Sequence, residues 1–377
     1  MASPRRVRHG VLAKARTGCF RRLTCWIIAA ILRFMSHFFH LRPCLQTAVR
    51  LLQSDTDEAR NRLYRQADEV RQRFMGNSVF IRGIVEFSNH CIRNCAYCGI
   101  RAGNNRVERY AMDLDELLET ARALPASGQT TIVLQSGESP TFGDDRMGAL
   151  IRRIKQETLL AVTLSVGARP RAIYQYWRDC GMDRYLIRFE TSDPELYARL
   201  HPDSTLRERL DCIQDLRDLG VQVGSGFMIG VPGETVETLA ENILLCRRLD
   251  LDMIGIGPFI SHPETPLASA PNAYAADPEM FFKALAVLRL FNPRSHIPAT
   301  TAYDAVFPGQ GRDWVLQRGA NVFMPNSTPG RYRKHYLLYP GKPCVDETAE
   351  QCGQCVRRRI ERLGRTIGQG SGHTLRP

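Results

Sequence analysis

From residue 80 onward, short apolar runs alternate with longer stretches in which apolar residues recur at helical spacing. The apolar runs predict eight strands, over residues 80–87, 130–135, 160–166, 184–190, 221–229, 252–258, 297–301 and 320–324. The stretches between them predict helices, among them 113–125, 171–180, 205–219, 234–249 and 277–291. Eight such units over about 250 residues predict a parallel (β/α)8 barrel of the TIM type. An open doubly wound sheet is the alternative, which the strand count and the lack of an early G-x-G-x-x-G disfavour.

The regions that flank the barrel divide the chain further. Residues 45–76 combine helical spacing with many charges and predict N-terminal helices. We therefore expect four parts. They are a basic and apolar extension (1–34), N-terminal helices (35–79), the barrel (80–326) and a C-terminal extension (327–377).

Charge is concentrated at the N-terminus. The net charge is +12, and residues 1–34 carry eight basic side chains and no acid, so that the rest of the chain carries only +4. The remainder has no basic stripe with interleaved aromatic residues, so nucleic acid is not expected as a partner. The apolar stretch 23–41 is interrupted by Arg33, His37 and His40, which makes it a marginal membrane span. A targeting peptide and weak membrane association stay open, but we favour a true translation start at Met35 rather than Met1.

Twelve cysteines stand out in a chain of 377 residues. A chain of this size builds a core without disulfides, so we expect metal-bound thiolates in a reducing cytoplasm. Three cysteines, Cys91, Cys95 and Cys98, follow the first strand with the spacing C-x3-C-x2-C. In a barrel, this loop opens onto the carboxyl-terminal rim, where the chemistry of such folds is found.

Soft sulfur ligands select zinc or iron–sulfur clusters. A structural zinc ion takes four ligands, and His90 is poorly placed as the fourth because it adjoins Cys91. A [4Fe–4S] cluster held by three cysteines leaves one iron open to a chelating ligand. Zinc with a remote fourth ligand and three free buried thiols are the less favoured alternatives.

The cysteine loop, with Tyr97 before its last cysteine, resembles the radical S-adenosylmethionine (SAM) enzymes. From about Leu45 to Gly364 the chain resembles, within that superfamily, the HydE-type [FeFe]-hydrogenase maturases. The motifs that carry this resemblance are IRGIVEFSNHC, YCGIRAGN, IVLQSGE, DRYLIRFET, GPFISHPETPLA, IPATTA and ANVFMPNSTP followed by YPGK. It implies a [4Fe–4S] cluster on the three cysteines, with SAM at the open iron, and reductive cleavage of SAM to a 5′-deoxyadenosyl radical. Biotin synthase and methylornithine synthase are the alternatives inside the superfamily.

The resemblance also implies roles for residues at the strand ends. The expected SAM contacts are Tyr97, Ser136, Gly137, Glu138, Glu190, Arg209 and Met228. The expected substrate-cavity residues are Gln135, Thr163, Arg184, Arg188, Met253, Thr300 and Thr301. Spacing alone places Arg184, Arg188 and Glu190 on one face of a strand, and buried arginines need an acid or an anionic ligand. A structural salt bridge is equally compatible with these arginines, and the pattern alone makes Arg209 a solvated charge.

A second group, Cys344, Cys352 and Cys355, has the spacing C-x7-C-x2-C. The resemblance implies a second iron–sulfur cluster there, [2Fe–2S] or [4Fe–4S], while a dispensable surface cluster and free thiols remain alternatives. Cys180, Cys212 and Cys246 lie in helical patterns and are expected to be buried fillers.

The function implied by the resemblance is assembly of the hydrogenase H-cluster. The expected substrate is a small organometallic iron species derived from an amino acid, and the expected partners are an electron donor such as ferredoxin or flavodoxin and fellow maturases. A different class, a structural zinc or scaffold protein, would bind neither SAM nor iron.

Overall fold

The computed structural model describes residues 43–374, so the expectations for residues 1–34 lie outside the described residues. Residues 43–52 are helical, and α2 (Asp57–Met75) follows them. Thr56 caps α2 by accepting the N–H of Ala59, and two acidic residues occupy its first turn, as a helix start favours. α2 packs against α9 (Glu279–Phe291), which is buried along most of its length. No helix in the described part of the chain has the length and apolar character that crossing a membrane requires.

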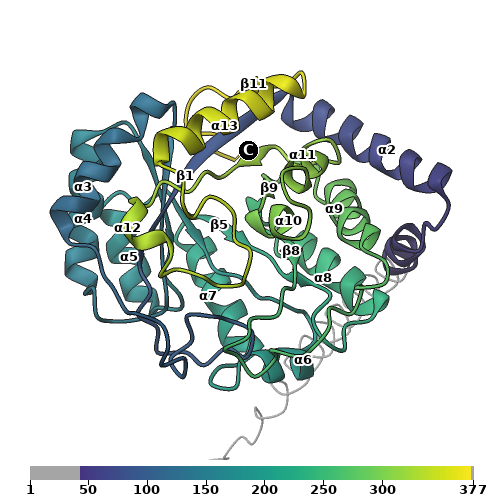
Figure 1. The fold of residues 1–377 in the computed structure, drawn as a ribbon, viewed down its shortest axis with the longest axis horizontal. Helices are drawn as coiled ribbons and strands as arrows, with labels where there is room; N and C mark the ends of the chain where they lie inside the picture. Colours follow the sequence, from purple (N-terminus) through teal and green to yellow (C-terminus); the bar gives the residue numbers. More distant parts are fainter. Residues whose placement is uncertain (1–42, 375–377) are drawn as a thin grey trace, which may run out of the picture. The chain divides into compact units, whose positions relative to one another are not determined.

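Eight parallel strands form the predicted barrel (Figure 1). They are β1 (Ser78–Ser88), β2 (Thr131–Ser136), β3 (Ala161–Ser165), β4 (Arg184–Leu186), β5 (Gln222–Ser225), β7 (Met253–Ile254), β9 (Pro298–Ala299) and β10 (Val322–Phe323). The order is β7-β5-β4-β3-β2-β1-β10-β9, and a parallel bridge between Met253 and His296 joins its two ends. β5 and β7 resume after a break as the pair β6 (Met228–Ile229) and β8 (Gly257–Pro258). All eight predicted strands are confirmed, although several are shorter than their apolar runs.

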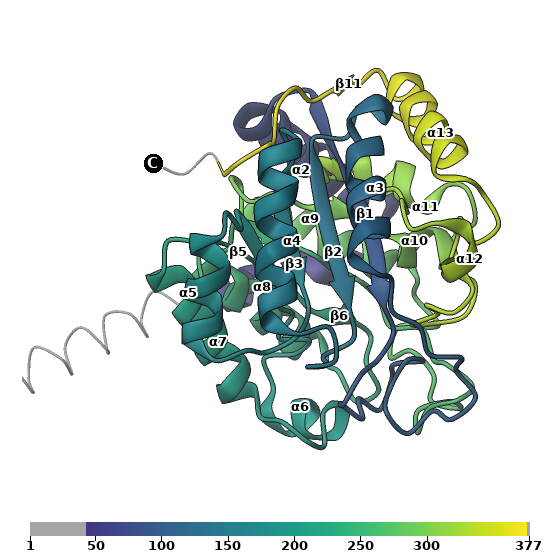
Figure 2. The same ribbon diagram turned by 90° about the vertical axis from the view of Figure 1, so that its left-hand side faces the viewer.

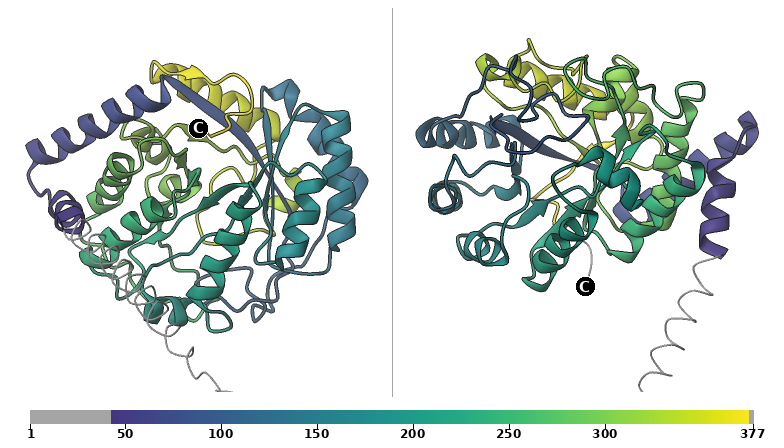
Figure 3. Two further views of the ribbon diagram at one scale, coloured as in Figure 1. Left: turned by 180° about the vertical axis from the view of Figure 1, so that it is seen from behind. Right: turned by 90° about the horizontal axis from the view of Figure 1, so that it is seen from below.

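The helices surround the strands, as the view from below shows (Figure 3, right). The main outer helices are α3 (Leu114–Ala123), α4 (Asp144–Glu157), α5 (Arg171–Asp179), α7 (Leu206–Asp218), α8 (Val236–Arg248) and α9. Shorter elements are η1 (Pro125–Ser127), α6 (Pro194–Leu200), α10 (Thr301–Val306), α11 (Gly311–Leu316) and α12 (Gly330–Arg333). α13 (Ala349–Arg362) and β11 (Thr366–Ile367) are the last helix and strand of the described residues. The five helices predicted by range are confirmed to within two residues, and the four-part division of the chain stays a prediction.

The C-terminal tail closes the amino-terminal end of the barrel. β11 pairs with Ser78 and Val79 at the start of β1, opposite the end at which α6 lies (Figure 2). Beyond it, the carbonyl oxygens of Ser371 and Gly372 accept hydrogen bonds from Arg184 and Arg82 at 2.7 and 2.9 Å. The polar glycine-containing tail therefore supplies acceptors for two buried arginines at the barrel floor.

The prediction that Arg184 lines the substrate cavity is wrong. Arg184 and Arg188 share a strand face, but four residues span about 13 Å along a strand. Arg184 thus lies at the floor with Thr131, Gln222 and the tail, and burial lowers its pKa to about 10. Thr163, paired in register with Arg184, is fully buried and also lies outside the cavity.

The break between β5 and β6 depends on Gly226. Its φ is +154°, and a Cβ there would lie 1.9 Å from the carbonyl oxygen of Gly255. Since that contact is with backbone, no side-chain rotation relieves it. Glycine at position 226 therefore permits a close approach of two backbone segments.

We predict that Gly226→Ala lowers the free energy of unfolding by about 3 kcal/mol, because overpacking against backbone forces a main-chain shift. Gly330→Ala is the matched control, since a Cβ at Gly330 meets nothing within 4 Å. Chemical denaturation of both variants measures the difference. Equal stability of the two variants would contradict the assignment.

Candidate functional site

A cavity of about 350 Å³ opens at the carboxyl-terminal ends of the strands. Nearly all of the residues proposed for the site from the sequence line it. They are Cys91, Cys95, Tyr97, Cys98, Gln135, Ser136, Gly137, Glu138, Arg188, Glu190, Arg209, Met228, Met253, Thr300 and Thr301. The structure thus brings together residues from six strand ends and the following segments, and leaves out Thr163 and Arg184.

The cysteine loop folds around the side chain of Arg109. The guanidinium donates hydrogen bonds to the carbonyl oxygens of Asn89, Ile100, Arg101 and Asn104 at 2.6–3.2 Å. A guanidinium group is planar and has five N–H donors, so one arginine can satisfy several carbonyl oxygens at once. Arg109 therefore shapes residues 89–104 into a loop that presents its cysteines to the cavity.

The three thiols are half-buried at the cavity. Burial raises the pKa of Cys98 to about 12 and that of Cys91 and Cys95 above the ordinary value, so all three are neutral thiols in the absence of a cation. Metal binding at this loop must therefore release protons. The sulfurs of Cys91, Cys95 and Cys98 do not all lie within 4.8 Å of one another; among residues 43–374, only a set of ligand atoms at the second cysteine group does. One zinc ion holds thiolates at about 2.3 Å, and hence within about 4.6 Å of one another, so these sulfurs suit a larger group such as an iron–sulfur cluster.

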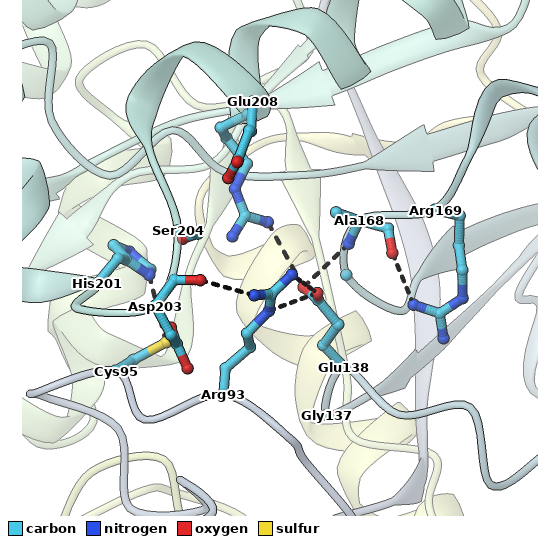
Figure 4. A network of polar contacts seen from close by, with 12 residues as sticks. Arg93, Cys95, Gly137, Glu138, Ala168, Arg169, His201, Asp203, Ser204 and Glu208 are labelled. Carbon is cyan, nitrogen blue, oxygen red and sulfur yellow. Dashed lines mark hydrogen bonds and ion pairs between the residues drawn. The ribbon is translucent and has the colours of Figure 1, made fainter.

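Glu138 fixes the cysteine loop to the rim (Figure 4). Its Oε1 accepts from Arg93 Nε at 2.6 Å, and its Oε2 accepts the N–H of Ala168 at 3.0 Å. Arg93 also donates to the carbonyl oxygen of Asp203 at 2.8 Å. The carboxylate is 7% exposed, so removal of its charge would leave Arg93 without its main partner.

The neighbouring Gly137 is required by packing. A Cβ at this position would lie 2.4 Å from the carbonyl oxygen of His90 and 2.7 Å from the Cβ of Cys91. The Ile92 N–H donates to the carbonyl oxygen of Glu138 at 2.8 Å. The SGE sequence thus lets the end of β2 lie directly against the cysteine loop.

Glu190 is held in a strained conformation at the end of the fourth barrel strand. Its φ is +63°, which is uncommon for a residue other than glycine and typical of functional sites. Arg188 Nη2 lies 3.0 Å from Glu190 Oε2, close enough for an ion pair but without hydrogen-bond geometry, and Tyr97 Oη lies 3.4 Å from Oε1. Burial raises the pKa of Glu190, against the opposing effect of Arg188 and Arg209. A buried carboxylate with an unsatisfied oxygen is suited to a cationic ligand.

Arg209 lies in the cavity wall rather than in solvent. It is 9% exposed, its Nε donates to Tyr197 Oη at 3.3 Å, and its Nη1 lies 4.0 Å from Glu138 Oε2. The interpretation of Arg209 as one of several solvated charges is therefore wrong. Arg209 shares the buried face of α7 with Ile213 and Leu216.

An apolar wall adjoins the cysteine loop. Met228 packs with Leu196, Leu200, Val231 and Phe259, and the partly buried Tyr97 packs against this cluster. Such a surface beside a few polar groups is typical of pockets for flat organic ligands.

Several cavity residues were not predicted from the sequence. Lys342 Nζ forms a buried ion pair with Glu86 and donates to the carbonyl oxygen of Tyr336 at 2.9 Å. Tyr339 Oη lies 2.5 Å from Thr301 Oγ1. A charged residue inside the apolar run of the first strand was the only local signal for Glu86, and the YPGK motif at residues 339–342 gave no role to Tyr339 or Lys342. His201, also missed, lies 3.3 Å from Cys95 Sγ through its Nδ1.

The second cysteine group is only partly assembled. Ligand atoms of Cys344, Glu347 and Cys352 lie within 4.8 Å of one another, whereas Cys355 is exposed and outside this set. The hydrogen bond with Cys352 lowers the pKa of Cys344 to about 7. The buried Arg333 donates to the carbonyl oxygen of Cys344 at 3.0 Å. Of the helical cysteines, Cys180 and Cys246 are buried as predicted, and Cys212 is half-buried.

Comparison with known proteins places these features in context. Residues 85–246 match the Radical SAM superfamily. The chain is 45% identical over 331 residues to the [FeFe] hydrogenase maturase subunit HydE of Thermotoga maritima, covering 88% of this chain and 93% of that protein. It is 29% identical to the 3-methylornithine synthase of Methanosarcina acetivorans, covering 72% and 76% of the two chains. The crystal structure of methylornithine synthase (PylB) aligns with a TM-score of 0.74 at 25% identity, covering 86% and 94%.

We predict that Glu138→Gln lowers the free energy of unfolding by roughly 2–3 kcal/mol, because it leaves the charge of Arg93 without its carboxylate. It should also reduce the iron bound per chain, since the cysteine loop loses its anchor. Thermal unfolding and iron analysis measure both effects.

The matched control is Glu264→Gln, which removes the exposed pair with Arg106 and should cost less than about 1 kcal/mol. If Glu138→Gln behaved like this control in both measurements, Glu138 would not anchor the loop.

Proposed function

Because the chain belongs to the radical SAM superfamily and, within it, to the HydE family of [FeFe]-hydrogenase maturases, we propose that Cys91, Cys95 and Cys98 hold a [4Fe–4S] cluster that binds SAM. The observation that supports these ligands is the placement of three half-buried thiols in the lining of a rim cavity. When bound, the cluster supplies the electron that cleaves SAM to a 5′-deoxyadenosyl radical.

The wall residues provide a partner for each part of SAM. Glu190, buried and held at positive φ, faces the ammonium or sulfonium charge. Arg209 is positioned to bind the carboxylate, as guanidinium forks favour. The backbone at Ser136 and Gly137 offers carbonyl acceptors to the ammonium, with Tyr97 beside it. Met228 and its apolar neighbours form a surface for the adenosine.

The deeper part of the cavity suits a small anion. Nε and Nη2 of Arg188 are buried and donate no hydrogen bond in the structure; Nη2 faces Glu190 as an ion pair, and Nε is left as a charged donor for a ligand. Gln135, Thr300, Thr301 and Met253 line the same space. We propose that it holds an organometallic iron species derived from an amino acid, a precursor of the H-cluster diiron unit. Ferredoxin or flavodoxin would supply electrons, and fellow maturases would exchange intermediates with the enzyme.

We propose a second iron–sulfur site at Cys344, Cys352 and Cys355. The proximity of the first two sulfurs supports it, and Cys355 lies one turn beyond Cys352 on α13. Arg333 connects this site to the cavity side of the chain by donating to the carbonyl oxygens of Cys344 and Asn326.

We predict that the anaerobically reconstituted protein shows an EPR spectrum that shifts when SAM is added, and that it forms 5′-deoxyadenosine under reduction. Cys95→Ser should lose the SAM-responsive signal and at least 100-fold of the product, because an open cluster needs all three thiolates. Cys212→Ser is the control, as Cys212 lies on α7 away from the loop. A zinc-containing, iron-free protein would contradict the radical SAM assignment.

We predict that the gene restores hydrogenase activity in a strain that lacks its HydE-type maturase. The Cys95→Ser variant should fail to do so. SAM cleavage without restored activity would leave the radical chemistry intact and contradict the maturation role, in favour of a relative such as methylornithine synthase.

For the second site, we predict that Cys344→Ser lowers the iron content of the protein while the SAM-responsive EPR signal persists. The reason is that the two cysteine groups are separate sets of ligands. Unchanged iron content in Cys344→Ser would argue for free thiols.

A further inference from the structure

His201 lies behind the cysteine loop, at the C-terminal end of α6. It is 4% exposed, and its Nδ1 lies 3.3 Å from Cys95 Sγ, a contact drawn in Figure 4. Its Nε2 lies 3.4 Å from Tyr97 Oη. The imidazole therefore bridges a cysteine of the loop and the tyrosine that precedes the last cysteine.

The ring has little freedom to turn away. It stacks on Tyr197 with ring centroids 4.5 Å apart, and it meets the edge of Tyr97 at 5.5 Å. Tyr197 is itself held by Arg209, whose Nε donates to its hydroxyl at 3.3 Å. Backbone bonds also tie the two segments, because the Ala96 N–H donates to the carbonyl oxygen of Leu200 at 2.8 Å.

The chemistry of a metal-bound thiolate decides the direction of this hydrogen bond. A thiolate has no proton and can only accept, so the 3.3 Å contact is favourable only if Nδ1 carries the hydrogen. Nε2 then has no hydrogen and can only accept, and it faces the Tyr97 hydroxyl, whose other acceptor is Glu190 Oε1 at 3.4 Å. Backbone groups face the sulfurs of Cys91 and Cys98, whereas Cys95 is the only one of the three with a side-chain donor among residues 43–374.

We propose that His201 is a positioning residue that donates its Nδ1–H to the Cys95 thiolate and raises the reduction potential of the [4Fe–4S] cluster. The inference rests on the proposed role of Cys95 as a cluster ligand. Reduction adds one electron from a low-potential donor and one negative charge to the cluster. A hydrogen bond to a ligand sulfur stabilises the reduced form more than the oxidised form, because it is stronger toward the more negative acceptor. His201 thus makes the electron transfer that precedes SAM cleavage easier.

The test is a redox titration of the reconstituted protein without SAM, monitored by EPR. His201→Leu, which removes the donor, should lower the ratio of reduced to oxidised cluster about tenfold at a fixed potential, equivalent to a midpoint about 59 mV more negative for one electron. His201→Asn places an amide N–H near the position of Nδ1, and its ratio should stay within about threefold of the unaltered protein. His90→Leu is the matched control, because His90 adjoins Cys91 but its side chain makes no hydrogen bond to a sulfur among residues 43–374, and it should leave the ratio unchanged.

A His201→Leu midpoint equal to that of the unaltered protein, with full iron content, would overturn the inference. If His201→Leu assembles no cluster, the inference is tested instead with the unaltered protein labelled with [15N]histidine. Pulsed EPR of its reduced cluster should show a 15N coupling that disappears in His201→Asn, and the absence of this coupling would overturn the inference. A protein that binds no cluster at all would instead contradict the proposed function.

Discussion

The buried carboxylate of Glu138 is the interaction on which the site depends. It joins the cysteine loop after β1, through Arg93, to the segment after β3, through the N–H of Ala168, and it lies 4.0 Å from Arg209 on α7. These groups come from separate βα units, so one carboxylate sets the position of three units at the rim. A charge this well enclosed is costly unless every partner is in place, and this makes the arrangement all-or-none. The glycine before it permits the close approach, because a Cβ there would clash with the cysteine loop.

Arginine side chains inside the barrel have different surroundings at its amino-terminal floor and at its carboxyl-terminal rim. At the floor, Arg82 and Arg184 donate to carbonyl oxygens of the tail, and their role is to hold residues 371 and 372. Nearer the rim, Arg188 keeps buried donors without acceptors beside the strained Glu190. Arg82 Nε also lacks a hydrogen-bond partner, so what distinguishes Arg188 is that its unsatisfied donor lies in the rim cavity, where a ligand can reach it. This division agrees with the general rule that the active sites of such barrels lie at the carboxyl-terminal rim.

Local sequence signals were sufficient for the barrel and for the cysteine loop. The strands were predictable because each is a buried apolar run closed by a polar or glycine residue, and the loop because three cysteines within eight residues have few structural explanations. Other features depend on contacts between distant segments. Lys342 pairs with Glu86 across 256 positions, and His201 reaches Cys95 across 106. The period of a strand places Arg184 and Arg188 on one face, but it does not show which of them lies at the floor of the barrel and which at the rim. The charge of Arg209 suggested an exposed side chain, although it lies on the buried face of α7.

The central claim is that the three-cysteine loop leaves a metal position that SAM fills as a chelating ligand. Pulsed ENDOR spectroscopy of the reduced protein with SAM labelled by 15N in its amino group and 17O in its carboxylate tests this most directly. The account predicts strong couplings from both labels, because both atoms would bind the open iron of the cluster. Their absence in a protein that contains a full cluster and bound SAM would contradict it.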